Sequence, residues 1–344
     1  MDFREYIREL ILEAIASGWE RFASEDDCSV LTISEPQITE RDIKTGKHVE
    51  GKIPWYSFSL RSGLTCPGAS VCKATADLQT GKISRSPKNI EPGGFTCFAA
   101  STEMLYPKAR VARQNNFDLL MSRYRKPKLE LDDSEKPLSN PTDAMAHLIH
   151  RSLEEIKKPL PVFRIHVGGD FFSKSYINAW IQVATVMPNT IFYAYTKSLN
   201  LFSGMSQDTM PPNFRISASM GGKYDALIND MKIKFVKVVY SPEEAAEFTL
   251  PPYWARKLGR KKGLPIDHDD TYGWKHNEPY ALLVHGMQAA GSPASAARQQ
   301  LRKLGKIGSY GKRKLTAKDI QRMKGGITEL RMYIRKAILN ELKK

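Results

Sequence analysis

The stretch Val162–Asp170, which reads VFRIHVGGD, decides the fold class because a short apolar run leads directly into two glycines and an acid. The apolar run predicts a buried strand over 162–167. Ile177, Trp180 and Ile181 then recur at helical spacing, which predicts a helix over 176–186, and a second strand is expected over 190–195. These three elements form one strand–helix–strand unit.

The same alternation continues toward the C-terminus. Ser241-Pro242-Glu243-Glu244 has the cap, the proline and the acidic first turn of a helix start. Further strands are expected over 214–218, 233–240 and 280–284. This pattern predicts an α/β fold with a parallel sheet and crossover helices, either open or closed into a partial or complete βα barrel.

Small or polar residues follow each predicted strand. Ligands bind at the carboxyl ends of parallel strands, so these positions are candidates for a pocket, although loops contain such residues in any fold. His166, within a strand, is more typical of a structural histidine. The cofactor-binding candidates are Gly168, Gly169, Asp170, Lys197, Ser217, Ser219 and His285.

Three of the four cysteines lie upstream in a loop-like stretch: Cys66, Cys72 and Cys97. The Gly, Pro and Ser residues around them are poor core residues, so the cluster favours a soft-metal site. Five residues separate the first two cysteines and 24 separate the second from the third, which differs from the close pairs of structural zinc sites. Three thiolates suit a [4Fe-4S] cluster with one iron left open, while zinc and three unrelated thiols remain alternatives. Cys28 is interpreted as a bystander.

The composition bounds the class of protein. A chain of 344 residues that is 41% hydrophobic and 26% charged can bury a substantial core. Its net charge of +15 is typical of proteins with an anionic partner, such as a nucleic acid or a phosphorylated metabolite. A solvated basic surface without such a partner is an equal alternative. The chain shows neither a secretory signal nor an apolar run of about 18 residues, so we expect a cytoplasmic protein with reduced thiols and no membrane contact.

Three regions are expected along the chain. Residues 1–54 would form an N-terminal helix, over 2–17, and an irregular lead-in. Residues 55–310 would form the iron-sulfur βα-barrel domain, and 311–344 a basic C-terminal helix. Within the middle region we expect an inserted loop over 79–94, a helix over 99–123, and an excursion over 253–274 that lies on the face carrying the site or acts as a lid.

Several motifs occur together in a fixed order. The first are Cys66-Pro67-Gly68-Ala69, Cys72-Lys73 and Cys97-Phe98-Ala99, followed by a helix with Arg110, Arg113 and Asn116. The later ones are Arg164-Ile165-His166, Gly169-Asp170-Phe171-Phe172-Ser173 and Phe192-Tyr193-Ala194-Tyr195-Thr196-Lys197. Over residues 55–310 the chain thereby resembles the phage "gene product 88" family of largely uncharacterised proteins. The resemblance implies a phage protein in the cytoplasm of an infected host cell.

That family is in turn similar to radical S-adenosylmethionine enzymes, which implies a TIM-like partial barrel with N- and C-terminal helical extensions. In those enzymes three cysteines after the first strand hold a [4Fe-4S] cluster, and a Gly-Gly-Glu receives the amino group of S-adenosylmethionine. Gly168-Gly169-Asp170 resembles that motif with a shorter acid. The cysteine spacing departs from the family's, so cluster binding is better supported than radical chemistry.

Two functions therefore stand as expectations. The first is an iron-sulfur protein that acts as a radical S-adenosylmethionine-like enzyme, with an electron donor as its partner, or a descendant that kept only the cluster. The second is a basic nucleic-acid-binding phage protein in which iron-sulfur or zinc is structural.

Overall fold

A computed structural model describes residues 30–33, 37–41, 48–70, 72–85, 97–127, 140–205, 209–267, 270–284, 288 and 293–303. The helix expected over 2–17 and the basic C-terminal helix expected over 311–344 lie outside these residues. So do Cys28 and the candidate ligand residue His285.

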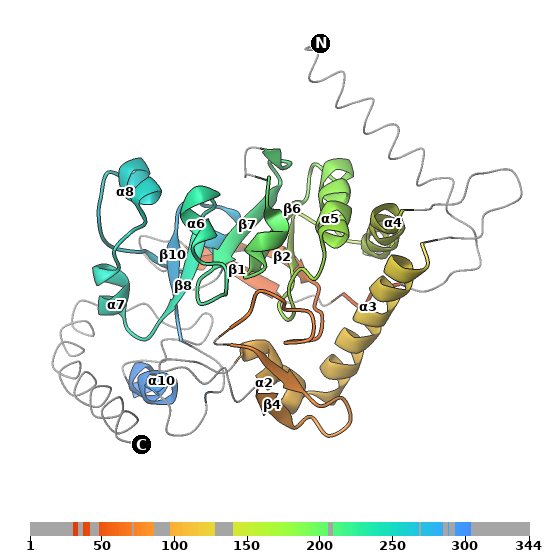
Figure 1. Cartoon of the computed structure of the whole chain (residues 1–344), viewed down its shortest axis with the longest axis horizontal. Helices are drawn as coiled ribbons and strands as arrows, with labels where there is room; N and C mark the ends of the chain where they lie inside the picture. The colour runs from red at the N-terminus through yellow and green to blue at the C-terminus, as the bar shows by residue number, and fades with distance from the viewer. Residues whose placement is uncertain are drawn as a thin grey trace, which may run out of the picture.

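A curled sheet of eight strands forms the centre of the molecule (Figure 1). Its order is β1-β2-β5-β6-β7-β8-β10-β9, and every neighbouring pair is parallel except β1 with β2. The strands are β1 (Gln37–Arg41), β2 (His48–Ser57), β5 (Val162–Ile165), β6 (Ile191–Thr196), β7 (Phe214–Ser219), β8 (Phe235–Val239), β9 (Ile266–Asp267) and β10 (Tyr280–Leu283). The seven parallel strands make a half-barrel, which confirms the predicted α/β class.

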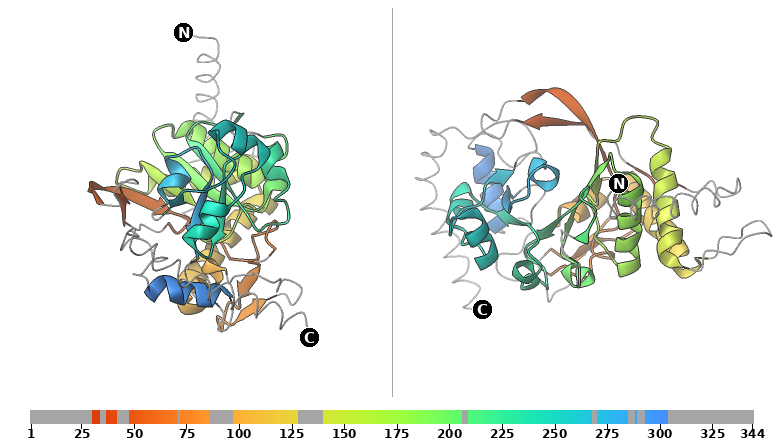
Figure 2. Two further views of the ribbon diagram at one scale, coloured as in Figure 1. Left: turned by 90° about the vertical axis from the view of Figure 1, so that its left-hand side faces the viewer. Right: turned by 90° about the horizontal axis from the view of Figure 1, so that it is seen from above.

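The helices that follow β5, β7 and β8 pack on the convex face of this sheet (Figure 2). The described helices are α2 (Phe98–Leu105), α3 (Pro107–Arg125), α4 (Pro141–Glu154), α5 (Lys174–Val186), α6 (Leu227–Asp230), α7 (Pro242–Glu247), α8 (Pro252–Leu258), α9 (Thr271–Trp274) and α10 (Pro293–Lys303), with a 3-10 turn η2 (Leu199–Phe202). Trp180 of α5 is buried between Phe163 and Phe192, with ring centroids 5.6 and 5.9 Å away. Aromatic burial of this kind fixes α5 on the sheet.

Serine residues cap the N-termini of two of these helices. Ser173 accepts a hydrogen bond from the Tyr176 amide at 3.1 Å, so α5 begins two residues before the predicted start. Ser241 accepts one from the Glu244 amide at 3.2 Å, and α7 begins at Pro242 as its sequence predicts.

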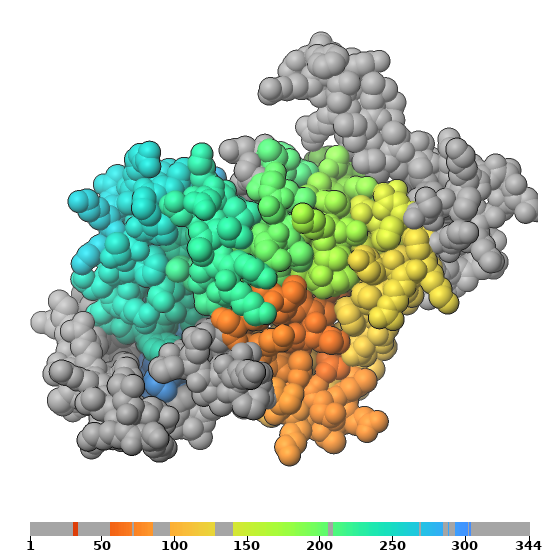
Figure 3. Space-filling model, viewed as in Figure 1, coloured from red at the N-terminus to blue at the C-terminus, as the bar shows by residue number. Residues whose placement is uncertain are grey.

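The region over 79–94, expected to be a loop, contains a strand within its described part. β4 (Ile83–Arg85) pairs antiparallel with β3 (Ala74–Ala76). The helix expected over 99–123 is also two helices. The break falls at Tyr106, whose backbone is extended because Pro107 disfavours the helical conformation of the residue before it. The space-filling view shows the hairpin segment, in orange, beside the yellow helix α3 (Figure 3).

The excursion over 253–274 does not lie on the face that carries the cysteines. Its helix α9 fills the half-barrel at the opposite end, near the starts of the strands. Lys234, just before β8, donates to the carbonyls of Tyr272, Gly273 and His276 at 2.7–2.8 Å. The Asp270 carboxylate lies deeper, against Arg164 and Tyr195. Asp267 and Asp270 are both buried, and α9 is a plug rather than a lid.

Candidate functional site

The loop that carries Cys66 and Cys72 follows β2 and crosses the carboxyl ends of the parallel strands. The Ser70 hydroxyl donates to the Gly221 carbonyl at 2.9 Å, and the Lys223 amide donates to the Gly68 carbonyl at the same distance. A Cβ on Gly68 would stand 2.0 Å from the Lys197 carbonyl, so only glycine lets the loop approach β6 this closely. The loop is thus docked on the ends of β6 and β7.

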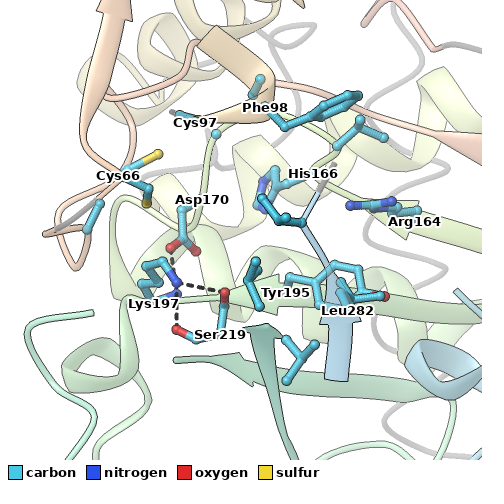
Figure 4. Close-up of a pocket in the computed structure, with 18 of the residues that line it drawn as sticks. Cys66, Cys97, Phe98, Arg164, His166, Asp170, Tyr195, Lys197, Ser219 and Leu282 are labelled. Carbon is cyan, nitrogen blue, oxygen red and sulfur yellow. Dashed lines mark hydrogen bonds between the residues drawn. The ribbon is translucent and has the colours of Figure 1, made fainter. Parts of the chain in front are cut away.

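All three clustered cysteines line one cavity of about 190 Å³ at this end of the half-barrel (Figure 4). Cys97 enters it from the N-terminal end of α2. Of the predicted cofactor-binding residues, Gly169, Asp170, Lys197 and Ser219 line the same cavity. Sequence positions more than 150 residues apart therefore meet where parallel α/β folds bind ligands.

The three thiols are free and only partly exposed. Burial raises the pKa of Cys97 to about 11, and the nearby Cys72 adds to the shift. Burial also raises the pKa of Cys66 well above its usual value, and the negative charge of Asp170 raises it further. For Cys72 burial again raises the pKa, while Lys197 opposes the shift. Without a cation, all three are neutral thiols at pH 7.

Asp170 is almost fully buried after the end of β5, and its carboxylate accepts hydrogen bonds from groups at the ends of β5 and β6. It accepts hydrogen bonds from the Phe171 amide at 2.7 Å, the Thr196 hydroxyl at 2.6 Å and the Lys197 amide at 2.8 Å. Burial raises its pKa, and these three bonds counteract the shift. The acid therefore ties the end of β5 to the end of β6.

Lys197 connects the end of β6 to the end of β7. Its Nζ donates to the Ser219 carbonyl, the Ser219 hydroxyl and the Met220 carbonyl at 2.6–2.8 Å. Figure 4 shows Asp170, Lys197 and Ser219 together on the side of the cavity near Cys66. This wall of the site is consequently polar and rigid.

Gly168 and Ser217 do not line the cavity. A Cβ on Gly168 would meet the Arg113 guanidinium at 2.8 Å, and one on Gly169 would meet Leu60 and Thr65 at 2.6 Å. Packing against α3 thus accounts for Gly168, and packing against the cysteine loop accounts for Gly169. Ser217 is fully buried and lies 3.3 Å from the Tyr280 hydroxyl, away from the cavity lining.

His166 lines the cavity and is also packed among aromatic side chains. Its Nε2 lies 2.9 Å from the Tyr176 hydroxyl, and the Phe171 ring is 4.8 Å away. Burial lowers its pKa to about 3, with Arg164 adding to the effect. The ring is therefore neutral at physiological pH, as a structural histidine would be.

Sequence reasoning missed a buried group of charges beneath the cysteine loop. Glu103 of α2 is fully buried and pairs with Arg61 at 3.3 Å and Arg113 at 3.1 Å. It also accepts from the Ser62 amide at 2.8 Å. Because these residues are spread over more than 50 positions, no local sequence spacing connects them. The one available sequence signal for this buried group was the pair Arg110 and Arg113 on α3.

A preformed metal site and a membrane-spanning helix are both absent from the described part of the chain. No three His, Cys, Asp or Glu side chains there are already arranged around a common point as metal ligands. No described helix is long and apolar enough to cross a membrane.

The comparisons with known proteins agree on one family. The model of the family "Gene product 88" matches residues 33–304. A relative, the "Gene 88 protein" of Mycobacterium phage D29, is 28% identical over 165 residues, covering 43% of this chain and 63% of the relative. The chain therefore spans less than two thirds of that relative's length, and no solved structure matches it. Because the family model covers most of the chain, including every cysteine and strand end of the site, the protein belongs to the Gene product 88 family.

Proposed function

We propose that this protein binds a [4Fe-4S] cluster through Cys66, Cys72 and Cys97 and works as a radical S-adenosylmethionine-like enzyme. The observation that carries the proposal is the convergence of all three cysteines with Gly169 and Asp170 in one cavity at the carboxyl ends of a parallel half-barrel. The cysteine loop follows the first parallel strand, β2, and the Gly-Gly-Asp follows the next strand in the sheet, β5.

The donor set fits such a group. Three soft sulfur donors approach from one loop and one helix start, and no disulfide engages them. Their thiols have raised pKa values, so iron must displace their protons as it binds. When bound together with S-adenosylmethionine, a cluster of this kind supplies one-electron reduction and hydrogen-atom abstraction from a C–H bond.

The chain's own residues would hold and shield that chemistry. The loop between β2 and α2 supplies the sulfur ligands, and the backbone at Gly169 offers a surface for the amino acid part of S-adenosylmethionine. Asp170 and Lys197 fix the ends of β5, β6 and β7 around it. The plug α9 closes the far end and thereby limits the access of water. We place the protein in the host cytoplasm, with an electron donor as its partner.

Anaerobic purification followed by iron and sulfide analysis tests the cluster. We expect about four irons and four sulfides per chain, the stoichiometry of a cubane cluster, and a broad visible absorption that bleaches on reduction. Each of Cys66→Ala, Cys72→Ala and Cys97→Ala should abolish it, whereas Cys28→Ala is the matched control and should retain it. A colourless protein with one zinc per chain would overturn the proposal. A brown protein that leaves S-adenosylmethionine intact when reduced would keep the cluster and remove the enzyme.

A second candidate is nucleic-acid binding, because α8 and the turn after it carry basic side chains. Arg256, Lys257 and Lys261 are exposed and form no ion pair with a described carboxylate, whereas Arg260 and Lys262 pair with Glu278 and Glu247. Cations of this kind bind phosphates in a salt-dependent way. Replacing the first three by Gln should flatten the salt dependence of binding to DNA or RNA oligonucleotides, and the triple Cys→Ala variant should leave it unchanged.

A further inference from the structure

The cavity has two chemically different walls. The ends of β5, β6 and β7 contribute His166, Asp170, Lys197 and Ser219. The adjoining wall comes from β8 and the β10 segment, with Gln288 at its edge, and carries four aliphatic side chains: Val236, Val238, Leu282 and Val284. These residues alternate along their strands, so that each pair points to the same side of the sheet.

The ion pair at the base of the cavity is hydrogen-bonded, whereas the buried Nδ1 of His166, which also lines the cavity, has no hydrogen-bond partner among the described residues. Asp270 pairs with Arg164 and accepts from the hydroxyls of Tyr195 at 2.8 Å and Tyr193 at 3.3 Å. The Arg164 guanidinium also lies 4.8 Å from the centre of the Tyr195 ring. The deep end therefore presents a neutralised ion pair and an aromatic face, rather than a charge that demands a charged ligand.

Burial next to the aliphatic wall favours a group without polar atoms. A hydroxyl or phosphate placed there would lose its water and find no partner on β8 or β10, which costs free energy. An alkyl group would gain from leaving water.

We propose that the aliphatic wall formed by Val236, Val238, Leu282 and Val284 binds a hydrocarbon chain of the substrate. This inference rests on the proposed function, in which the polar wall and the cysteines hold the cofactors. The substrate is then a molecule whose reacting C–H bond belongs to an alkyl group.

The test uses straight-chain alcohols from butanol to octanol as probes for the full-length protein. Nuclear magnetic resonance of isotope-labelled Val and Leu methyl groups reports where they bind. We expect saturable shifts at Val236, Val238 and Leu282, with affinity rising about fourfold for each added CH₂ until the cavity is full. Hexane diol, which has a hydroxyl at both ends, should bind at least tenfold more weakly than hexanol.

Two variants and one control make the assignment specific. Leu282→Asn should weaken hexanol binding at least tenfold, and Val238→Trp should abolish it by filling the space even if the asparagine variant folds poorly. Leu105→Asn, on the exposed part of α2, is the matched control and should bind as the parent does. Shifts spread over the whole protein, or affinities independent of chain length, would overturn the inference.

The same titration separates this inference from the proposed function. The aliphatic wall contains no cysteine, so hexanol should still bind to the triple Cys→Ala variant. Alcohol binding in a protein that never assembles a cluster would sustain the hydrocarbon site and reject the cluster. An assembled cluster without alcohol binding would reject the hydrocarbon site alone.

Discussion

At the scale of single residues, the cysteine site depends on one buried carboxylate. Glu103 has no exposed surface, yet it neutralises Arg61 and Arg113 and accepts hydrogen bonds from both the amide and the hydroxyl of Ser62. Arg61 lies in the cysteine loop and Arg113 lies on α3. The carboxylate therefore joins the loop that carries Cys66 to the helices that follow Cys97.

Replacing this carboxylate should be costly. Glu103→Gln keeps the shape but leaves two buried guanidinium groups without their counter-charge, and we expect a loss of about 3–5 kcal/mol in the free energy of unfolding. Urea denaturation monitored by circular dichroism measures it. Glu154→Gln, which removes an exposed partner of His150, is the matched control and should cost about 0.5 kcal/mol or less. Equal losses in the two variants would contradict the role assigned to Glu103.

His166 makes the stability of the fold depend on pH. Its pKa is about 3 in the folded protein, below the value of about 6.5 expected in the unfolded chain. Below pH 6.5 the unfolded state therefore binds the proton and the folded state does not. The stabilisation is complete above pH 6.5 and falls as the pH drops toward 3.

We expect His166→Gln to reduce this acid sensitivity. The parent should lose about 1.4 kcal/mol per pH unit more than the variant between pH 6 and 4, as measured by denaturation at a series of pH values. His147, with a pKa lowered to about 4 by burial and nearby arginines, acts in the same direction and remains in the variant. Parallel curves for parent and variant would show that His166 titrates normally in the fold.

At the scale of elements, Arg110 binds the β3–β4 hairpin to α2 and α3, and Arg61 adds a hydrogen bond to the Ala76 carbonyl of β3. Arg110 donates to the carbonyls of Leu78 and Gln79 in the hairpin and to that of Glu103 in α2, at 2.7–3.1 Å. The sequence did not predict the hairpin because strands of three residues are too short to show an alternating pattern. Its position depends on a distant side chain rather than on local preference.

Arg110→Met should release the hairpin while the half-barrel stays folded. Hydrogen exchange over 74–85 should accelerate at least tenfold, because three backbone carbonyls lose their donors and the hairpin is only two strands. Arg125→Met, an exposed position on the same helix, is the control and should leave exchange unchanged. Acceleration throughout the sheet would instead mean that the arginine supports the whole fold.

The plug α9 is an element that fits its place only because Gly273 lacks a side chain. A Cβ there would stand 2.9–3.0 Å from the Tyr193 ring and 3.0 Å from the Tyr195 hydroxyl. Gly273→Ala should therefore lower the free energy of unfolding by about 1–3 kcal/mol, the usual cost of overpacking. Because Tyr193→Ala removes the clashing ring, the two changes together should cost less than the sum of the single changes in a double-mutant cycle. Strict additivity would exclude the clash as the cause.

At the scale of the whole molecule, the sequence predicted what depends on local pattern. The strand and helix alternation from Val162 onward identified the parallel sheet, and the polar strand ends identified Asp170, Lys197 and Ser219 as lining one cavity with the cysteines. The position of α9 was beyond such reasoning, because the buried partners of Asp270 lie 75 to 106 residues away. The charge of Asp270 alone is typical of a solvated loop.

The half-barrel consequently has two unlike ends, one closed by α9 and one that carries the cysteines. At the plugged end, Lys234 and Asp270 are held by hydrogen bonds that involve no cysteine. At the other end, the three thiols come from one loop and from the start of α2, and chain packing sets their mutual positions. A ligand that binds the folded state alone stabilises the segments it joins.

Assembly of the cluster should therefore protect one end of the molecule. After anaerobic reconstitution with iron and sulfide, hydrogen exchange should slow at least tenfold over 64–73, 97–101 and 196–199, and it should stay unchanged over 270–276. The triple Cys→Ala variant treated in the same way is the control and should show no protection. Uniform slowing at both ends would mean that metal stabilises the fold as a whole, as a structural zinc does, whereas protection confined to the cysteine end is the pattern expected of a cofactor seated in the cavity.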